Sequence, residues 1–154
     1  MGKNRRHKPV QPADKIPQRA QVPEQQRVPR AVGGTSYYCL RPSWRVGKME
    51  MVEPFGWHGV DGPTIQYIRS RLAHFETMTW GEILVQAKKQ NHSIHVEDIC
   101  SAAQQRLEAV GLLLEDVVSL RLSGRERVYG YLENGVLIVL WWDPLHQICP
   151  SLRE

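Results

Sequence analysis

The stretch VVSLRLSGRERVYGYLENGVLIVLWW, residues 117–142, decides the fold. It is rich in β-branched, aromatic and other apolar residues, and turn-forming residues interrupt it twice, at Ser123-Gly124 and at Glu133-Asn134-Gly135. Asn-Gly between two β-rich runs is the strongest short-range signal for a hairpin. The pattern therefore predicts three strands joined as an antiparallel meander, over residues 117–122, 127–132 and 136–142.

Three stretches that precede these strands have apolar residues at helical spacing. The first begins at Pro63, which suits the first turn of a helix, and runs to Phe75. The second begins at the capping box Thr79-Trp80-Gly81-Glu82 and ends before Asn91. The third spans residues 98–110 and ends at a glycine. Helices followed by a meander indicate an α+β domain, and we expect the helices to pack on one face of a small, mainly antiparallel sheet.

The charge of the chain lies in its N-terminal segment. Residues 1–32 hold eight lysines and arginines against two acids, a net charge of +6, whereas the other 122 residues hold 12 against 14, a net charge of −2. The first 32 residues also contain five prolines and few large apolar side chains, so they cannot bury enough surface to fold. We expect residues 1–34 to form a disordered, basic, proline-rich arm and residues 35–154 to form one α+β domain. The arm either attracts nucleic acid or ribosome surfaces or is only a solubilising tail.

Composition also excludes several classes of protein. No apolar run approaches the roughly 18 residues that a membrane helix needs, and no apolar segment follows the charged N-terminus as in a secretory signal. The three cysteines are far apart in the sequence, which predicts free thiols in a reducing cytosol. We therefore expect a cytoplasmic protein with no membrane partner. Phosphate-binding loops and a nucleophile elbow are absent from the sequence.

Strand alternation places four polar or aromatic side chains on one face of the sheet. Arg121 on the first strand shares this face with three residues of the second, and Arg125 and Glu126 lie at its rim; the three are Arg127, Tyr129 and Tyr131. Guanidinium groups bind phosphate through a fork of donors, and tyrosine rings stack on bases. The same pattern also occurs on a solvated sheet face, where such side chains serve no binding function.

The third strand ends in Trp141-Trp142-Asp143-Pro144-Leu145-His146. Adjacent tryptophans point to opposite faces, so we expect one in the core and one, Trp142, at the polar face. His146 has the chemistry of a general acid or base near neutral pH. Alternatively, Asp143 caps the turn and His146 is merely exposed. His92 and His95 lack a third ligand at suitable spacing, so the sequence predicts neither a metal nor another cofactor.

Residues 119–146 resemble the C-terminal half of the RelE/ParE superfamily of toxins from toxin–antitoxin systems. The resemblance lies in the strand motif Arg121-Leu-Ser-Gly-Arg-Glu-Arg-Val-Tyr129, the acidic turn, the apolar strand and the final His146. The preceding helix, with its A-x-x-R-L sequence at 103–107, also suits the order of elements in this family. The resemblance implies a RelE/ParE-like fold. In the ribonuclease branch it also implies an enzyme that enters the ribosomal A site and cleaves mRNA without a metal.

The chemistry that the resemblance implies is attack of a ribose 2′-hydroxyl on the adjacent phosphorus. It needs a base, a cation for the phosphorane oxygens and an acid for the leaving oxygen. By position, Arg121 and Arg127 would hold the phosphate, Tyr129 would stack or donate, and His146 would be the acid or base, with Glu126 as an alternative base. Further RNA contacts would come from Arg125, Tyr131, Trp142 and, in the arm, Lys3, Arg5, Arg6 and Lys8.

Two other functions fit the same sequence. A non-enzymatic member of the fold would bind a protein such as gyrase or another replication factor, and a phage-derived interaction protein would not be toxic. As partners, the toxin interpretation predicts a cognate antitoxin protein, together with mRNA and the ribosome.

Overall fold

The computed structural model describes residues 36–150, which belong to a compact unit that begins at Ser36. The arm expected over residues 1–34 lies outside the described residues, as do its RNA-contact candidates Lys3, Arg5, Arg6 and Lys8. The arm and those contacts stay predictions.

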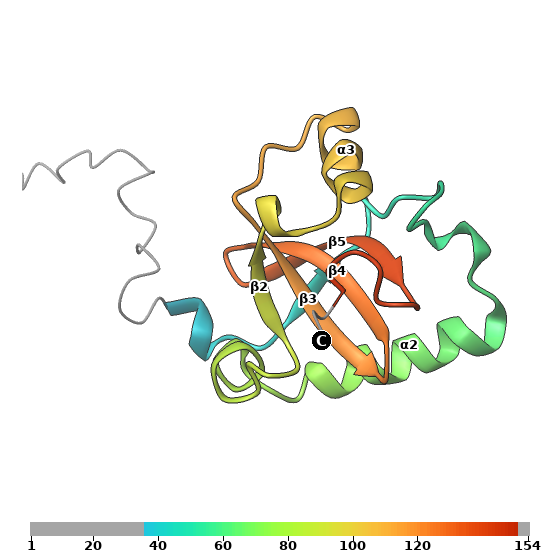
Figure 1. The fold of residues 1–154 in the computed structure, drawn as a ribbon. Helices are drawn as coiled ribbons and strands as arrows, with labels where there is room; N and C mark the ends of the chain where they lie inside the picture. The colour runs from blue at the N-terminus through green and yellow to red at the C-terminus, as the bar shows by residue number, and fades with distance from the viewer. Residues whose placement is uncertain (1–35, 151–154) are drawn as a thin grey trace, which may run out of the picture. The chain divides into compact units, whose positions relative to one another are not determined.

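A five-stranded mixed sheet forms the centre of the described unit (Figure 1). The strand order is β1-β5-β4-β3-β2; β1 runs parallel to β5, and the other neighbours are antiparallel. The bounds of the strands are β1 Ser43–Arg45, β2 His92–His95, β3 Asp116–Ser123, β4 Glu126–Glu133 and β5 Val136–Asp143. The predicted meander is confirmed as β3, β4 and β5. The α+β class is confirmed too, whereas the two short edge strands β1 and β2 were not predicted.

Two α-helices accompany the sheet, α2 over Gly62–Phe75 and α3 over Ser101–Ala109. The Asp61 side chain caps α2 by accepting a hydrogen bond from the Thr64 backbone N–H, and Pro63 occupies its first turn. Gly111 follows α3 with a positive φ of 71°, as expected for a C-terminal stop. Among the described residues, none of the helices has the length and apolar character that a membrane crossing requires.

The second predicted helix is shorter than expected. The capping box is present, because Thr79 and Glu82 exchange side-chain and backbone hydrogen bonds. The helical segment that follows is only a π-helical turn, Glu82–Gln86. The buried Asn91 side chain then accepts the Arg121 backbone N–H, at 2.9 Å, and the chain continues as β2 along the edge of β3. Residues 87–90, the last part of the predicted helix, form turns instead, before the chain pairs with the sheet.

The expectation that helices cover one face of the sheet is wrong. The α2 residues Ile68 and Phe75 pack in one apolar cluster with Leu120, whereas the α3 residues Ala103 and Leu107 pack in another. β5 contributes to both clusters, because its side chains alternate between the two faces of the sheet and are buried on each. Leu137 and Val139 lie in the first cluster, and Ile138 and Leu140 lie in the second. A sheet with an interior strand that is apolar on both faces must be covered on both.

Candidate functional site

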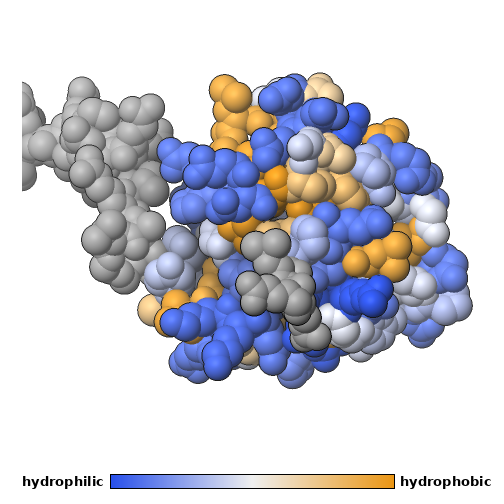
Figure 2. Space-filling model, in the orientation of Figure 1, coloured by the Kyte–Doolittle hydropathy of each residue, from blue (hydrophilic) through white to orange (hydrophobic). Residues whose placement is uncertain are grey.

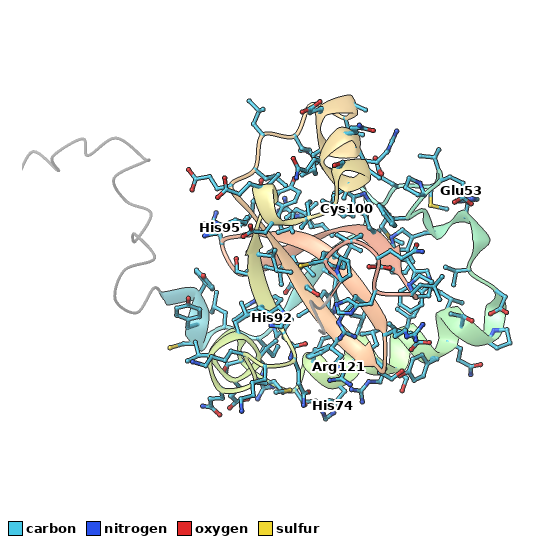
Figure 3. All side chains as sticks on the ribbon, viewed as in Figure 1. Glu53, His74, His92, His95, Cys100 and Arg121 are labelled. Atoms are coloured by element: carbon cyan, nitrogen blue, oxygen red, sulfur yellow. The ribbon has the colours of Figure 1, made fainter. Side chains whose placement is uncertain are left out.

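A hollow of about 770 Å³ lies where β2, the β3–β4 turn and the chain after β5 meet. We call it the basic pocket. Figure 3 shows two of its residues, His92 and Arg121, on the neighbouring strands β2 and β3. The pocket is lined by Lys89, His92, Ile94, Arg121, Gly124, Arg125, Arg127, Leu145, His146, Cys149 and Pro150.

The two arginines predicted to share a face do so. Arg121 and Arg127 are direct partners across the antiparallel β3–β4 pair, and both side chains line the basic pocket. Arg127 is largely buried and donates hydrogen bonds from Nη1 to the carbonyls of Gly124, at 2.9 Å, and Glu126, at 3.0 Å. Burial and the nearby charge of Arg121 lower the pKa of Arg127. A guanidinium stays charged at neutral pH nevertheless, so the pocket holds two adjacent fixed cations.

The pocket lining carries only positive and neutral groups. Lys89 and Arg125 add two cations to the arginine pair, and none of the lining residues is Asp or Glu. The nearest acid in register is Asp143, which faces Arg127 across the strands but is 1% exposed and outside the lining. In the space-filling view hydrophilic residues predominate on this side of the molecule, with smaller apolar patches between them (Figure 2). Such a hollow attracts anions, and its guanidinium groups suit phosphate in particular.

His146 lies over the pocket in the turn that follows β5. Its backbone has a φ of 57°, in the left-handed region that few non-glycine residues adopt. Burial lowers the pKa of His146, and the charges of Arg127, His92 and Arg121 act in the same direction, while Asp143 opposes them. The ring is therefore neutral at pH 7 and can accept a proton. The alternative that Asp143 caps this turn also holds, because its carboxylate accepts the backbone N–H groups of Gln147 and Ile148.

His92 is a pocket residue that sequence reasoning missed. The Lys88 carbonyl lies 2.7 Å from His92 Nδ1, and a carbonyl only accepts, so Nδ1 carries a proton and Nε2 is left for other partners. The sequence suggested only a pairing of His92 with His95, but His95 instead contacts Asp116. In the described part of the chain no group of three metal-ligating side chains occurs. In the structure residues 92–95 alternate in exposure as an edge strand does, but with Ile94 as the one apolar residue their sequence gives no such signal; Lys89 enters the pocket just before them.

Three aromatic residues predicted at the site lie elsewhere. Tyr129 is fully buried in the cluster beneath α3, next to Trp141 and opposite Ser119, and burial raises the pKa of its phenol strongly. The Tyr129 hydroxyl has no hydrogen-bond partner of good geometry. The Ser119 side chain nevertheless lowers the pKa of the phenol and so opposes part of the effect of burial. Tyr131 is also buried and borders a different hollow, beside Lys48. Alternation identified their face correctly, but α3 and Phe55 cover that face, so neither ring can stack on a base.

The third aromatic correction concerns Trp142. It packs against Trp57 on the α2 face of the sheet, with ring centroids 5.9 Å apart, and is 7% exposed. Trp141 occupies the core of the opposite face, where its indole N–H donates to Glu50. Both tryptophans are therefore core residues, because both faces of the sheet are covered.

The two rim residues differ in their outcome. Arg125 lines the basic pocket, as the rim position predicted. Glu126 does not: its carboxylate accepts a hydrogen bond of 2.7 Å from the Ser123 hydroxyl, and strand alternation turns it away from its neighbour Arg127. The structure thus brings together Arg121, Arg125, Arg127 and His146, and separates Glu126, Tyr129, Tyr131 and Trp142 from them.

Comparisons of the chain with protein-family models, with curated proteins and with solved structures find no match. The resemblance to RelE/ParE toxins therefore stays a prediction from residues 119–146 and the preceding helix.

Proposed function

We propose that this chain is a RelE-like toxin, a metal-independent endoribonuclease that acts on ribosome-bound mRNA in the bacterial cytoplasm. One observation carries the proposal: two cross-strand arginines meet two histidines at a pocket whose lining holds no carboxylate. The family resemblance adds a cognate antitoxin and the ribosome as partners.

The arginines have the chemistry to bind the scissile phosphate. Arg121 and Arg127 present guanidinium groups from neighbouring strands, and each can form a bidentate contact with phosphate oxygens. Two fixed cations also stabilise the extra negative charge of a pentacoordinate phosphorane without reorganising during the reaction. Arg127 is held in place by its two backbone carbonyl partners, so it is already oriented before RNA binds.

The histidines supply the proton transfers. Neutral His146 takes the proton of the ribose 2′-hydroxyl, and the 2′-oxygen forms a bond to phosphorus as the bond from phosphorus to the 5′-oxygen breaks. For the other transfer His92 acts as the imidazolium: its Nδ1–H donates to the Lys88 carbonyl, and its Nε2–H gives a proton to the departing 5′-oxygen. The products are a 2′,3′-cyclic phosphate and a 5′-hydroxyl end, and the reaction needs no other reactant. His92 thus supplies the acid, and Glu126, the alternative base, takes no part because its carboxylate accepts a hydrogen bond from the Ser123 hydroxyl.

This mechanism requires RNA rather than DNA, since the nucleophile is the 2′-hydroxyl.

An apolar wall of Ile94, Leu145 and Pro150 completes the pocket, and Leu145 is 56% exposed. With the predicted aromatic stackers buried, this aliphatic wall is the surface in the pocket that suits a sugar or base.

The test uses the full chain with translating ribosomes. We expect cuts in mRNA that leave 2′,3′-cyclic phosphate ends, and loss of the cuts in Arg127→Lys, His146→Asn and His92→Gln. Glu133→Gln, an exposed charge change at the far end of β4, is the matched control. A single 2′-deoxy nucleotide at the cut position should also abolish cleavage there.

Other outcomes would favour the competing functions. Intact mRNA together with arrested growth would overturn the ribonuclease and support a non-enzymatic member of the fold that inhibits a protein. Harmless overexpression of folded protein would instead support an interaction protein.

A further inference from the structure

Asp143 is a buried acid that the proposed reaction does not use. It is the last residue of β5, is 1% exposed and does not line the basic pocket. Burying a carboxylate is costly unless its oxygens are hydrogen-bonded. Here each oxygen has its own partner: Oδ1 accepts the Gln147 N–H and Oδ2 accepts the Ile148 N–H, each at 2.9 Å.

These two hydrogen bonds span the residue that carries the proposed base. His146 lies between Asp143 and its two amide partners, in a turn whose backbone at His146 has a φ of 57°. The far end of the turn is also fixed, since Ile148 is fully buried and its carbonyl accepts the Cys100 N–H at 2.7 Å. The carboxylate thus closes the turn that holds the imidazole over the pocket.

Asp143 also faces the phosphate-binding side of the site. It is the direct cross-strand partner of Arg127, and its negative charge favours the guanidinium of Arg127 and the imidazolium of His146. One buried charge therefore acts on two residues of the basic pocket without itself lining the pocket.

We propose that Asp143 is a positioning residue, which fixes His146 over the phosphate held by Arg121 and Arg127. The catalytic part of this inference rests on the proposed ribonuclease, but the positioning itself is a property of the folded chain. Asp143→Asn keeps the shape and removes the charge. Its amide NH₂ can no longer accept one of the two backbone N–H groups, so the turn loses a hydrogen bond.

The first readout is enzymatic. We expect kcat of Asp143→Asn to fall roughly 10- to 100-fold, since a base displaced by about 1 Å loses that much, with little change in KM. Glu133→Gln removes an equal charge from the end of β4 and should change neither constant. A rise in KM at constant kcat would overturn the positioning role.

The second readout does not need RNA cleavage. In NMR titrations of the full chain, removing the Asp143 charge should move the His146 pKa further down, because Arg127, Arg121 and His92 then act on it unopposed. The same pKa in wild type and Asp143→Asn would overturn the inference, whereas a wild-type protein that cleaves no RNA would overturn only the proposed function.

If Asp143→Asn fails to fold, hydrogen exchange in the wild-type chain still tests whether Asp143 holds the turn. The amide protons of Gln147 and Ile148 should then be far better protected from hydrogen exchange than the amide of exposed Leu145. Equal exchange at all three amides would overturn the inference.

Discussion

Arg121 and Arg127 face each other across the β3–β4 ladder, so the fold holds two like charges side by side. Like charges that are directly opposite in a sheet destabilise the pair, by about 0.2–1 kcal/mol. Burial and Arg121 both lower the pKa of Arg127, which shows that its surroundings disfavour the charged form. The arginine pair therefore lowers the stability of the fold, and a bound phosphate would relieve the repulsion between the two guanidinium groups.

Replacing one arginine should therefore stabilise the protein. We expect Arg121→Gln to raise the free energy of unfolding by about 0.2–1 kcal/mol at low ionic strength, and added salt to reduce this gain. Urea denaturation at low and high salt measures both effects, with Arg69→Gln on exposed α2 as the control. The variant should also bind RNA more weakly than wild type. A loss of stability at low salt would contradict the repulsion.

His146 should make stability depend on pH. Its pKa lies below the ordinary 6.5, because burial and Arg127 disfavour the imidazolium. The unfolded chain therefore binds this proton at a higher pH than the folded chain does. The contribution of His146 to stability is complete above pH 6.5 and is lost as the pH falls through the folded pKa.

His146→Asn tests this dependence, because asparagine tolerates the left-handed backbone at this position. Unfolding measured between about pH 5 and 7.5, the range around the ordinary histidine pKa, should show a smaller loss of stability on acidification than in wild type. His74→Gln, at the exposed end of α2, should behave like wild type. If His146→Asn and wild type lose the same stability on acidification, groups other than His146 account for the pH dependence.

Local sequence signals were sufficient for the strands that decide the fold. Asn134 and Gly135 both adopt positive φ, 50° and 82°, as a tight hairpin with Asn-Gly requires. Strand alternation then placed Arg121 and Arg127 on one face. These features depend on neighbouring residues alone, and for that reason the sequence could predict them.

The remaining features depend on contacts between distant segments. β1 has three residues and exists through its parallel pairing with β5, which no local pattern announces. Whether Tyr129 is exposed depends on α3 and Phe55, which cover it. The face of a side chain follows from alternation, but its burial follows from what packs on that face, so the arginines were predicted and the aromatic residues were not.

Gly130 should tolerate no side chain. The register between β4 and β5 shifts at Tyr129 and Gly130. Leu140 therefore has no opposite residue on β4, which makes it a β-bulge. A Cβ at Gly130 would lie 2.3 Å from the Ile138 carbonyl oxygen, a backbone atom that cannot turn aside. We expect Gly130→Ala to destabilise the fold by about 3 kcal/mol or more, as severe overpacking does. Gly59→Ala, with open space around it, is the control in thermal unfolding, and equal melting temperatures would contradict the clash.

Glu50 should stabilise the contact between α3 and the sheet. Its buried carboxylate accepts bonds from Arg106 Nη2, at 2.8 Å, and from the Trp141 indole N–H, at 2.9 Å. Glu50→Gln removes the charge that Arg106 pairs with but keeps an acceptor for Trp141. We expect a loss of about 1–3 kcal/mol in the free energy of unfolding, as for hydrogen bonds to charged groups. Glu108→Gln on the exposed side of α3 should cost little, and equal losses in the two variants would contradict the network.

The thiol of Cys149 should report whether the basic pocket is occupied. Burial raises the pKa of Cys149, and the neighbouring Asp98 and Cys100 add to the shift, so less of the reactive thiolate is present at neutral pH. Iodoacetamide should therefore label Cys149 more slowly than exposed Cys39, with a rate that increases with pH.

Because Cys149 lines the pocket and Cys39 does not, an RNA oligonucleotide made uncleavable by 2′-deoxy substitution should slow the labelling of Cys149 and leave Cys39 unchanged. Mass spectrometry of the labelled peptides measures the two rates in one sample. The same oligonucleotide should give no protection in Arg121→Gln, since the contact with phosphate is weakened there. Protection of both cysteines alike, or of neither, would place the RNA outside the basic pocket.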